Sequence, residues 1–292
     1  MIFSHILGGI GNQMFQYAAG RSLSYFHKQP LLLDLYDFEF YKLHNGFELQ
    51  RIFNIAANIG IKSDLKEILG WQRNSLINKV LRQPQFKSLR SRNFVVEPHF
   101  NYWSDFFKSP TNAYLRGYWQ SELYFKCIQN LIREEFKFKL PLSGENAKLA
   151  KLIQSQKSVS LHVRRGDYLT HLKTSRIMGT CSVDYYQKAV NLISSKIQSP
   201  VFYVFSDDIC WAKNNISMPH PCVYIDHNNH LESYRDMQLM SLCQHHIIAN
   251  SSFSWWGAWL GENSSKIVIA PKVWFQNGTN DSDLVPNKWI RL

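Results

Sequence analysis

Two short polar motifs, each directly after an apolar run, hold most of the residues in this chain that could do chemistry. The first, HVRRGDY, spans residues 162–168 and follows the apolar run 159–161. The second, SSFSWWGAWL, spans residues 251–260 and follows 247–249. The apolar runs predict strands, and open α/β sheets bind ligands where their strands end. Two anion-binding loops at such an edge would bind a diphosphate, which points to a nucleotide-activated substrate and hence to an enzyme.

The first motif offers two arginines at the end of its strand, Arg164 and Arg165. A guanidinium presents a rigid fork of N–H donors that matches two phosphate oxygens at once. Asp167 could hold one arginine in place, and His162 could contact a base or a ribose. The alternative is that Arg165 and Asp167 form an ordinary surface ion pair.

The second motif predicts a helix that begins in a run of serines. Ser251, Ser252 and Ser254 are all suitable N-caps, and the N-terminus of a helix attracts phosphate through its N–H groups and dipole. We expect the serines to contact phosphate, with plain capping as the alternative. Trp255 and Trp259 are four residues apart, so we expect them to pack inward together.

A glycine-rich loop, residues 8–13, follows the first apolar run of the chain. It is not a dinucleotide-binding GxGxxG loop, because Met14 stands at the last glycine position, and no Lys-Ser/Thr pair follows as in a Walker loop. Its glycines would let the backbone approach a ligand closely. Asn12 and Gln13 could hydrogen-bond sugar hydroxyls, although a simple tight turn would explain the same residues.

Asp207 and Asp208 follow another apolar run. They could contact a ribose or a purine edge, or they could bind a metal ion as a variant of the Asp-x-Asp motif of other sugar-nucleotide enzymes. Residues 281–283 have the Asp-x-Asp spacing but lie in a polar loop, where exposure to solvent is the default. The histidines do not show the spacing of a zinc site.

The elements that must position these motifs alternate between strand and helix. Strands are predicted at 2–7, 30–34, 114–119, 158–163, 201–205, 247–249 and 266–270, and helices at 12–26, 122–136, 231–242 and after Ser254. The opening strand–turn–helix–strand order is of the βαβ kind. Pro141 and Gly144 indicate a linker. At 292 residues the chain is long enough for two α/β domains.

The formal net charge of +11 favours an anionic partner. Residues 71–96 contain six basic and no acidic residues, with Leu76, Ile77, Val80 and Leu81 on one predicted helical stripe. Such a helix could lie on an anionic membrane surface or simply cover part of a core, which we favour. No apolar run approaches the ~18 residues of a membrane span. The five cysteines, without CxxC spacing, and a start unlike a signal peptide predict a cytoplasmic protein.

Taken together, these stretches resemble the bacterial α-1,2-fucosyltransferases of glycosyltransferase family 11. The matching motifs run along the whole chain: GGIGNQMFQYAAG, RGYWQSELYF, HVRRGDY, VFSDD, DMQLMSLC and ANSSFSWWGAWL. The resemblance implies an α/β, GT-B-like fold in which two Rossmann-type domains face a cleft. Residues 1–140 would form the acceptor-side domain and 141–292 the domain that binds GDP-fucose, with the last segment able to pack back on the first domain.

The resemblance also implies a reaction. L-fucose would pass with inversion from GDP-L-fucose to the 2-hydroxyl of a galactose, giving an α-1,2 linkage, with no metal ion or other cofactor. Arg164 would grip the β-phosphate and stabilise the leaving GDP, His162 and one of the paired aspartates would contact guanine or ribose, and residues 252–254 would meet the phosphates. The donor-binding residues so implied are Gly11, Asn12, Gln13, His162, Arg165, Asp167, Asp207, Asp208, Ser251, Ser252, Phe253 and Ser254.

The motifs do not contain a general base. An inverting displacement needs a group that accepts the proton of the acceptor hydroxyl, and neither Asn12 nor Gln13 can do so. The candidate bases are Asp34, Asp37, Glu39 and His99. A phosphate oxygen of the donor is the alternative acceptor of this proton.

Other functions remain open at this point. Another GDP-sugar transferase, such as an α-1,6-fucosyltransferase, would share the donor-binding half. The positive charge also permits a nucleic-acid-binding protein, but no motif of the common nucleic-acid-binding modules supports it. We expect the acceptor to be a galactose-terminated glycan, and a lipid carrier for that glycan would suit a cytoplasmic enzyme with peripheral contact to an anionic membrane.

Overall fold

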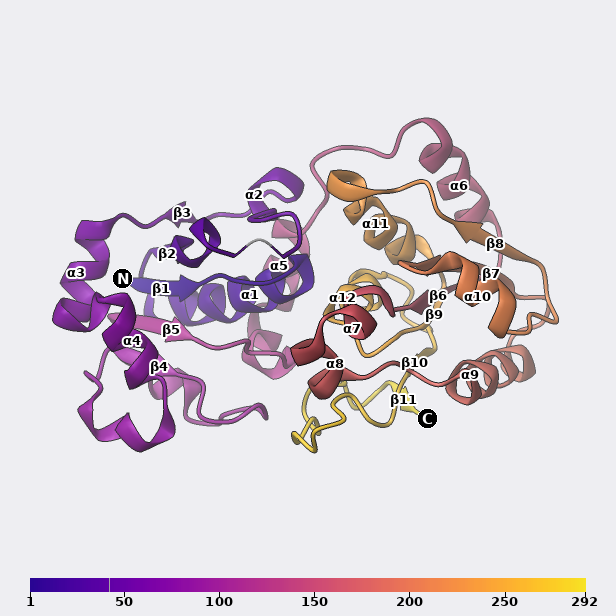
Figure 1. Cartoon of the computed structure of the whole chain (residues 1–292). Helices are drawn as coiled ribbons and strands as arrows, with labels where there is room; N and C mark the ends of the chain where they lie inside the picture. Colours follow the sequence, from indigo (N-terminus) through magenta and orange to yellow (C-terminus); the bar gives the residue numbers. More distant parts are fainter. Residues whose placement is uncertain (42) are drawn as a thin grey trace. The chain divides into compact units, whose positions relative to one another are not determined.

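The computed structural model describes residues 1–41 and 43–292, apart from the side chains of Ser75, Asp167 and Lys173. The chain divides into two compact units (Figure 1). Unit 1 comprises Met1–Lys139 with Ser282–Leu284, and unit 2 comprises Leu140–Asp281 with Val285–Leu292. The boundary falls one residue before the predicted one, and three residues of the last segment belong to unit 1.

In the described part of unit 1, the strands form a parallel sheet in the order β3-β2-β1-β5-β4. Their bounds are β1 Ile2–His5, β2 Leu31–Asp34, β3 Asn58–Ile59, β4 Phe94–Val96 and β5 Ala113–Arg116. β5 ends three residues before the predicted strand, because Gly117 begins a loop in which Trp119 has a positive φ.

The helices of unit 1 surround this sheet (Figure 1). They are α1 Ile10–His27, α2 Leu49–Ile52, α3 Lys62–Leu69, α4 Ser75–Leu81 and α5 Gln129–Glu135, with short 3-10 turns between them. Gly20 of α1 lies so close to β1 that a Cβ would stand 2.8 Å from the Cβ of Ser4. This close packing fixes the loop between β1 and α1.

The predicted helix 122–136 is wrong in its first half. Two 3-10 turns, Glu122–Tyr124 and Lys126–Ile128, precede α5. The first begins at Ser121, whose hydroxyl accepts a hydrogen bond from the backbone N–H of Leu123. Buried aromatic side chains, among them Tyr124 and Phe125, fill the core here. Tertiary packing therefore overrides the helical spacing of the apolar residues.

Unit 2 contains a second parallel sheet, in the order β11-β10-β9-β6-β7-β8. Its strands are β6 Ser158–Val163, β7 Val201–Ser206, β8 Cys222–Ile225, β9 His245–Ile247, β10 Val268–Ala270 and β11 Ile290–Arg291. Neighbouring residues along β7 point to opposite faces: Phe202 and Val204 pack in one hydrophobic cluster, and Tyr203 and Phe205 in another.

Helices cover both faces of this sheet. They are α6 Gly144–Ser155, α7 Gly166–Thr170, α8 Leu172–Met178, α9 Val183–Lys196, α10 Ile209–Asn215, α11 Tyr234–Leu242 and α12 Ser252–Leu260. Residues of α9 and α10 pack on one face, and those of α6 and α11 on the other. This is the arrangement of a Rossmann-type fold.

Of the four apolar residues predicted on one helical stripe at 76–81, two face the core and two face solvent. Leu81 is buried, and Ile77 is partly buried against the same cluster. Leu76 is 74% exposed and Val80 is 49% exposed. Successive residues of a helix point about 100° apart, so these two pairs form adjacent rows, of which one reaches the core.

Candidate active site

The turn after β6 is held by one carboxylate. Asp207, which follows β7, accepts hydrogen bonds from the backbone N–H groups of Arg165 (2.8 Å) and Gly166 (3.0 Å). The same carboxylate pairs with Nε of Arg164 at 3.3 Å. A Cβ on Gly166 would lie 2.9 Å from an oxygen of Asp207, so a larger residue would displace this carboxylate. The two motifs at the ends of β6 and β7 thus form one unit.

Arg165 is held by different neighbours. Its Nε lies 3.4 Å from Oδ2 of Asp208, and its guanidinium stacks over the ring of Trp211 at 3.9 Å. Asp208 also caps α10 by accepting a hydrogen bond from the backbone N–H of Trp211. The alternative of an ion pair between Arg165 and Asp167 involves a side chain outside those described, so the structure does not test it. The carboxylates that orient the arginines in the structure are those of Asp207 and Asp208.

His162 lies within β6 and is buried. Burial, followed by repulsion from Arg164, lowers the pKa of His162 to about 3, so its ring is neutral at neutral pH. Among the described side chains, none hydrogen-bonds its Nδ1 atom. The ring lies 5.7 Å from that of Phe253. A neutral imidazole beside an aromatic ring could contact a base by hydrogen bonding.

The serines at the start of α12 have different roles. The hydroxyl of Ser251 caps the helix by accepting from the backbone N–H of Phe253. Ser254 is buried and donates to the carbonyl of Ser251, so its predicted contact with phosphate is not supported. Ser252 is half-buried at the first turn. Trp255 and Trp259 are buried and stacked at 6.2 Å, as predicted.

The glycine-rich loop of unit 1 differs from its prediction. Gln13 is buried; its amide donates to the carbonyls of Gly8 and Gly46 (2.8 Å each) and accepts from the N–H of Glu48 (3.0 Å). These bonds tie the loop together and leave Gln13 little capacity for a sugar. The amide oxygen of Asn12 accepts from Gln120 at 2.7 Å. Gly11 lies buried in the first turn of α1.

Two of the candidate bases, Asp34 and Asp37, lie where β2 ends. Asp37 contacts Nε2 of His5 at 3.0 Å and pairs with Arg116 at 2.7 Å. The hydrogen bond from His5, followed by the charge of Arg116, holds the pKa of Asp37 well below its usual range, against the effect of burial. A carboxylate stabilised in this way is a weak base. The carboxylate of Asp34 is buried and accepts from the hydroxyl of Tyr114 at 2.6 Å.

The other two candidates, Glu39 and His99, are exposed side chains. One ring nitrogen of His99 lies 3.1 Å from the carbonyl of Asn101.

The sequence motifs did not single out Glu97, which follows β4. Its carboxylate accepts hydrogen bonds from the backbone N–H groups of Tyr118 (2.7 Å) and Trp119 (2.9 Å). Burial nevertheless raises the pKa of Glu97 to about 7. A Cβ on Gly117 would stand 2.5 Å from the Cβ of Glu97, so glycine is needed for this contact. The only related signal in the sequence was the RGYWQ segment at residues 116–120, which contains the residues that contact this carboxylate.

A general base works best when its pKa lies near the operating pH. By this criterion Glu97 is better suited than Asp37 to accept a proton near neutral pH. Among the side chains that the structure describes, no three His, Cys, Asp or Glu residues gather as metal ligands would.

Two Rossmann-type units, one with paired arginines at the carboxyl edge of its sheet, define the class of sugar-nucleotide glycosyltransferases with a GT-B fold. The chain belongs to glycosyltransferase family 11, whose family model matches residues 48–292. The expected family and fold class are therefore confirmed.

Known proteins resemble the chain along its whole length. It is 36% identical to the alpha-1,2-colitosyltransferase of Escherichia coli, covering 100% of this chain and 99% of that protein. It is also 36% identical to the O-antigen biosynthesis glycosyltransferase WbnK of Escherichia coli, with both chains covered in full. The solved structure of an Arabidopsis thaliana FUT1 mutant in complex with GDP matches 98% of this chain and 75% of that one, with a TM-score of 0.56 and 12% identity. That likeness shows the fold.

Replacing Arg164 by lysine keeps the charge but removes the fork of donors. We expect Arg164→Lys to lower kcat/KM by about 100- to 1,000-fold, the effect typical of losing one donor that stabilises a developing charge. Initial rates of sugar transfer measure this. Arg92→Lys, at an exposed arginine, is the matched control and should retain activity. Near-normal turnover in Arg164→Lys would contradict the role of this residue.

The raised pKa of Glu97 predicts that transfer activity depends on pH. As a base it must lose its proton, so kcat/KM should rise with pH through about 7, where burial places the pKa of Glu97. Glu97→Gln should flatten this rise and reduce kcat by about 100-fold or more. Asp236→Asn is the control, because burial also raises the pKa of Asp236, in unit 2, to about 7. If kcat/KM still rises with pH in Glu97→Gln and no longer rises in Asp236→Asn, Glu97 is excluded as the general base.

Proposed function

We propose that the protein transfers L-fucose, with inversion, from GDP-L-fucose to the 2-hydroxyl of a galactose in a glycan acceptor, forming an α-1,2 linkage. The observation that carries this proposal is the turn after β6, where Asp207 orients Arg164. Membership of glycosyltransferase family 11 supports sugar transfer as the reaction.

Departure of GDP is the step in which Arg164 acts. As the bond between fucose and the β-phosphate breaks, negative charge grows on the phosphate oxygens, and a cation already in place stabilises that charge. The ion pair at Nε fixes the plane of the guanidinium, so little reorganisation is needed at that moment. We propose that the reaction needs no metal ion, so that Arg164 supplies this charge stabilisation and activity survives EDTA.

Proton removal from the acceptor hydroxyl completes the reaction. We assign this step to Glu97, whose pKa is raised by burial to about 7, in place of the three carboxylates and one histidine expected from the sequence. The proton passes from the 2-hydroxyl to the carboxylate as the new bond to fucose forms.

A second candidate donor is a GDP-linked colitose. One full-length relative is named an alpha-1,2-colitosyltransferase, while more distant relatives, such as one from Bos taurus at 26% identity, are named galactoside 2-alpha-L-fucosyltransferases. The first name gives an α-1,2 linkage, and the second gives α-transfer of fucose to the 2-position of a galactoside. Transfer rates measured with each of the two donors will therefore identify the donor sugar.

The acceptor glycan belongs, we propose, to a surface polysaccharide assembled on a lipid carrier at the cytoplasmic face of a membrane. A relative covering the full chain is named an O-antigen biosynthesis glycosyltransferase. In the part of the chain that the structure describes, no helix is long and apolar enough to cross a membrane. Contact with the membrane would instead use the surface of α4 and the 3-10 turns beside it.

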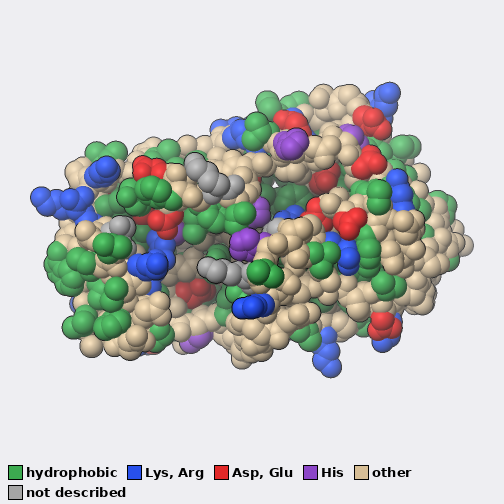
Figure 2. Space-filling view, in the orientation of Figure 1, with side chains coloured by type: hydrophobic (Ala, Val, Ile, Leu, Met, Phe, Trp, Pro, Cys, Tyr) green, Lys and Arg blue, Asp and Glu red, His purple; other side chains and the backbone are tan. Residues whose placement is uncertain are grey.

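This surface combines exposed apolar and basic side chains. Trp71 is 63% exposed, and Leu76, Val80 and Leu89 are exposed near it in the sequence. Hydrophobic and basic side chains are mixed over the part of unit 1 formed by α3 and α4 (Figure 2). Apolar side chains that insert and basic ones that face anionic headgroups are what a peripheral membrane surface requires.

The test of the proposed reaction is incubation with GDP-fucose, or with GDP-linked colitose, and a panel of galactosides, with and without EDTA. We expect fucose transfer to the 2-hydroxyl of galactose, an α-linked product by NMR, and equal rates in EDTA. A β-linked or 6-linked product, or transfer of colitose alone, would contradict the proposal.

Membrane contact has its own test in co-sedimentation with vesicles. We expect binding to vesicles that contain phosphatidylglycerol, weakening as salt rises, and loss of binding when Trp71 and Leu76 are both changed to serine. Leu152→Ser removes a similarly exposed leucine of unit 2 and should bind as the unchanged protein does. Equal binding to neutral vesicles, or none at all, would exclude this surface.

A further inference from the structure

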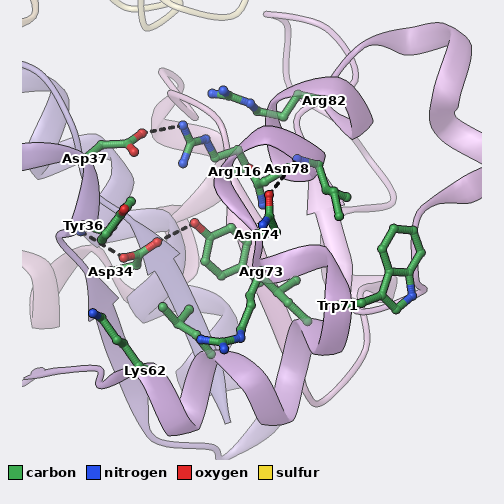
Figure 3. A pocket seen from close by; sticks show the side chains of 14 residues that line it. Asp34, Tyr36, Asp37, Lys62, Trp71, Arg73, Asn74, Asn78, Arg82 and Arg116 are labelled. Atoms are coloured by element: carbon green, nitrogen blue, oxygen red, sulfur yellow. Dashed lines mark hydrogen bonds and ion pairs between the residues drawn. The ribbon is translucent and has the colours of Figure 1, made fainter. Parts of the chain in front are cut away.

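A cavity of about 690 Å³ opens within unit 1, beside the ends of β2 and β5 and between them and α3 and α4 (Figure 3). Its charged lining consists of Asp34, Asp37, Lys62, Arg73, Arg82 and Arg116. The volume lies in the range of sites for small molecules. The proposed reaction assigns no task to this cavity.

The two carboxylates of the cavity are already satisfied. Asp34 accepts from the hydroxyl of Tyr114 (2.6 Å) and from the backbone N–H of Tyr36 (3.0 Å). Asp37 pairs with Arg116 at 2.7 Å and contacts His5 at 3.0 Å. Dashed lines in Figure 3 mark the contact of Asp37 with Arg116 and those of Asp34 with its neighbours. The negative charge in the cavity is therefore engaged by its immediate neighbours.

Three cations of the cavity have no such partner. Among the described side chains, no carboxylate lies within ion-pair distance of Lys62, Arg73 or Arg82. Arg82 is half-buried. Burial, followed by repulsion from Arg116, lowers the pKa of Arg82, yet an arginine stays charged in proteins. Asp37 attracts Arg82 from beyond ion-pair distance. A half-buried cation with no carboxylate in direct contact is costly, and a bound anion would offset this cost.

The position of Arg82 is fixed by the chain around it. Arg90 donates from Nε to the carbonyl of Leu81 (2.6 Å) and from one terminal nitrogen to those of Arg82 (3.2 Å) and Gln83 (3.1 Å). These bonds engage the last carbonyl of α4 and the two that follow it, and they hold the backbone from which Arg82 projects. A cation placed by such a device is preorganised for a ligand.

The rest of the lining suits a sugar phosphate. The side-chain oxygen of Asn74 caps α4 by accepting from the N–H groups of Leu76 and Ile77, which leaves its amide N–H groups to donate. Trp71 offers an exposed indole beside the cavity. Figure 3 shows Arg82 and Arg116 at one side of the cavity and Lys62 and Arg73 at another.

We propose that this cavity binds the phosphate groups of the acceptor, namely the diphosphate through which a glycan is joined to its lipid carrier. The inference rests on the proposed function for the identity of the acceptor. The chemistry it invokes, several cations around one phosphate anion, is independent of which sugar is transferred. The basic and apolar surface of α4 adjoins this cavity in the chain, so lipid and diphosphate would meet neighbouring residues.

Titration with inorganic pyrophosphate, followed by calorimetry, tests the anion site without any transfer reaction. We expect Arg82→Gln to weaken binding by about tenfold or more, as expected for lost hydrogen bonds to a charged group, and Arg73→Gln to weaken it as well. Arg73 is exposed, so that variant serves if Arg82→Gln fails to fold. Arg92→Gln, which removes an exposed arginine outside the cavity, should bind as the unchanged protein does.

The same titration separates this cavity from the donor site. Binding should persist in Arg164→Lys and in the presence of saturating GDP. Pyrophosphate binding that Arg164→Lys or GDP abolishes, and that Arg82→Gln and Arg73→Gln leave unchanged, would overturn the proposal.

Two synthetic acceptors distinguish a phosphate of the acceptor from a free phosphate. They share a terminal galactoside and differ in whether a diphosphate or a neutral ether joins the glycan to the lipid. We expect a KM at least about tenfold lower for the diphosphate acceptor, and loss of that preference in Arg73→Gln. Equal KM values in the unchanged protein would overturn the assignment to the acceptor. If neither acceptor is fucosylated, the proposed function fails, and the pyrophosphate titration still decides whether the cavity is an anion site.

Discussion

The carboxylate of Asp207 is the interaction on which the candidate donor site depends. It accepts from two consecutive backbone N–H groups, those of Arg165 and Gly166, and pairs with Nε of Arg164. One side chain from the end of β7 thus shapes the turn that follows β6. A parallel sheet makes this contact natural, because the ends of neighbouring parallel strands lie at the same edge. Without this contact, a guanidinium at this position would spread over several rotamers instead of presenting one geometry.

Unit 1 shows how environment assigns different tasks to similar groups. Asp37 lies between His5 and Arg116, and its pKa is held low. Glu97 is half-buried, two backbone N–H groups donate to its carboxylate, and desolvation raises its pKa to about 7. The first carboxylate is suited to orient Arg116 and the second to exchange a proton. Divergent pKa values among nearby acids are a common sign of divided roles in catalysis.

Much of the fold could be predicted from the sequence, because strands of parallel sheets are continuous apolar runs. β2, β6 and β7 were located to within a residue at each end. The helix predicted across 122–136 was broken, because buried aromatic packing is not visible in apolar spacing. The partners of the arginines could not be predicted either: Asp167 was the nearest carboxylate in sequence, whereas Asp207 and Asp208 are brought to Arg164 and Arg165 by the pairing of β6 with β7.

The central claim is that Arg164 acts on the leaving GDP in the transition state. Single-turnover rates and the donor Kd, both measured for Arg164→Lys, test this claim most directly. A contact that strengthens as charge develops should lower the rate of transfer by about 100-fold or more while the Kd for GDP-fucose changes far less. A weakened Kd with an unchanged single-turnover rate would show that Arg164 merely binds the donor, and would contradict the account.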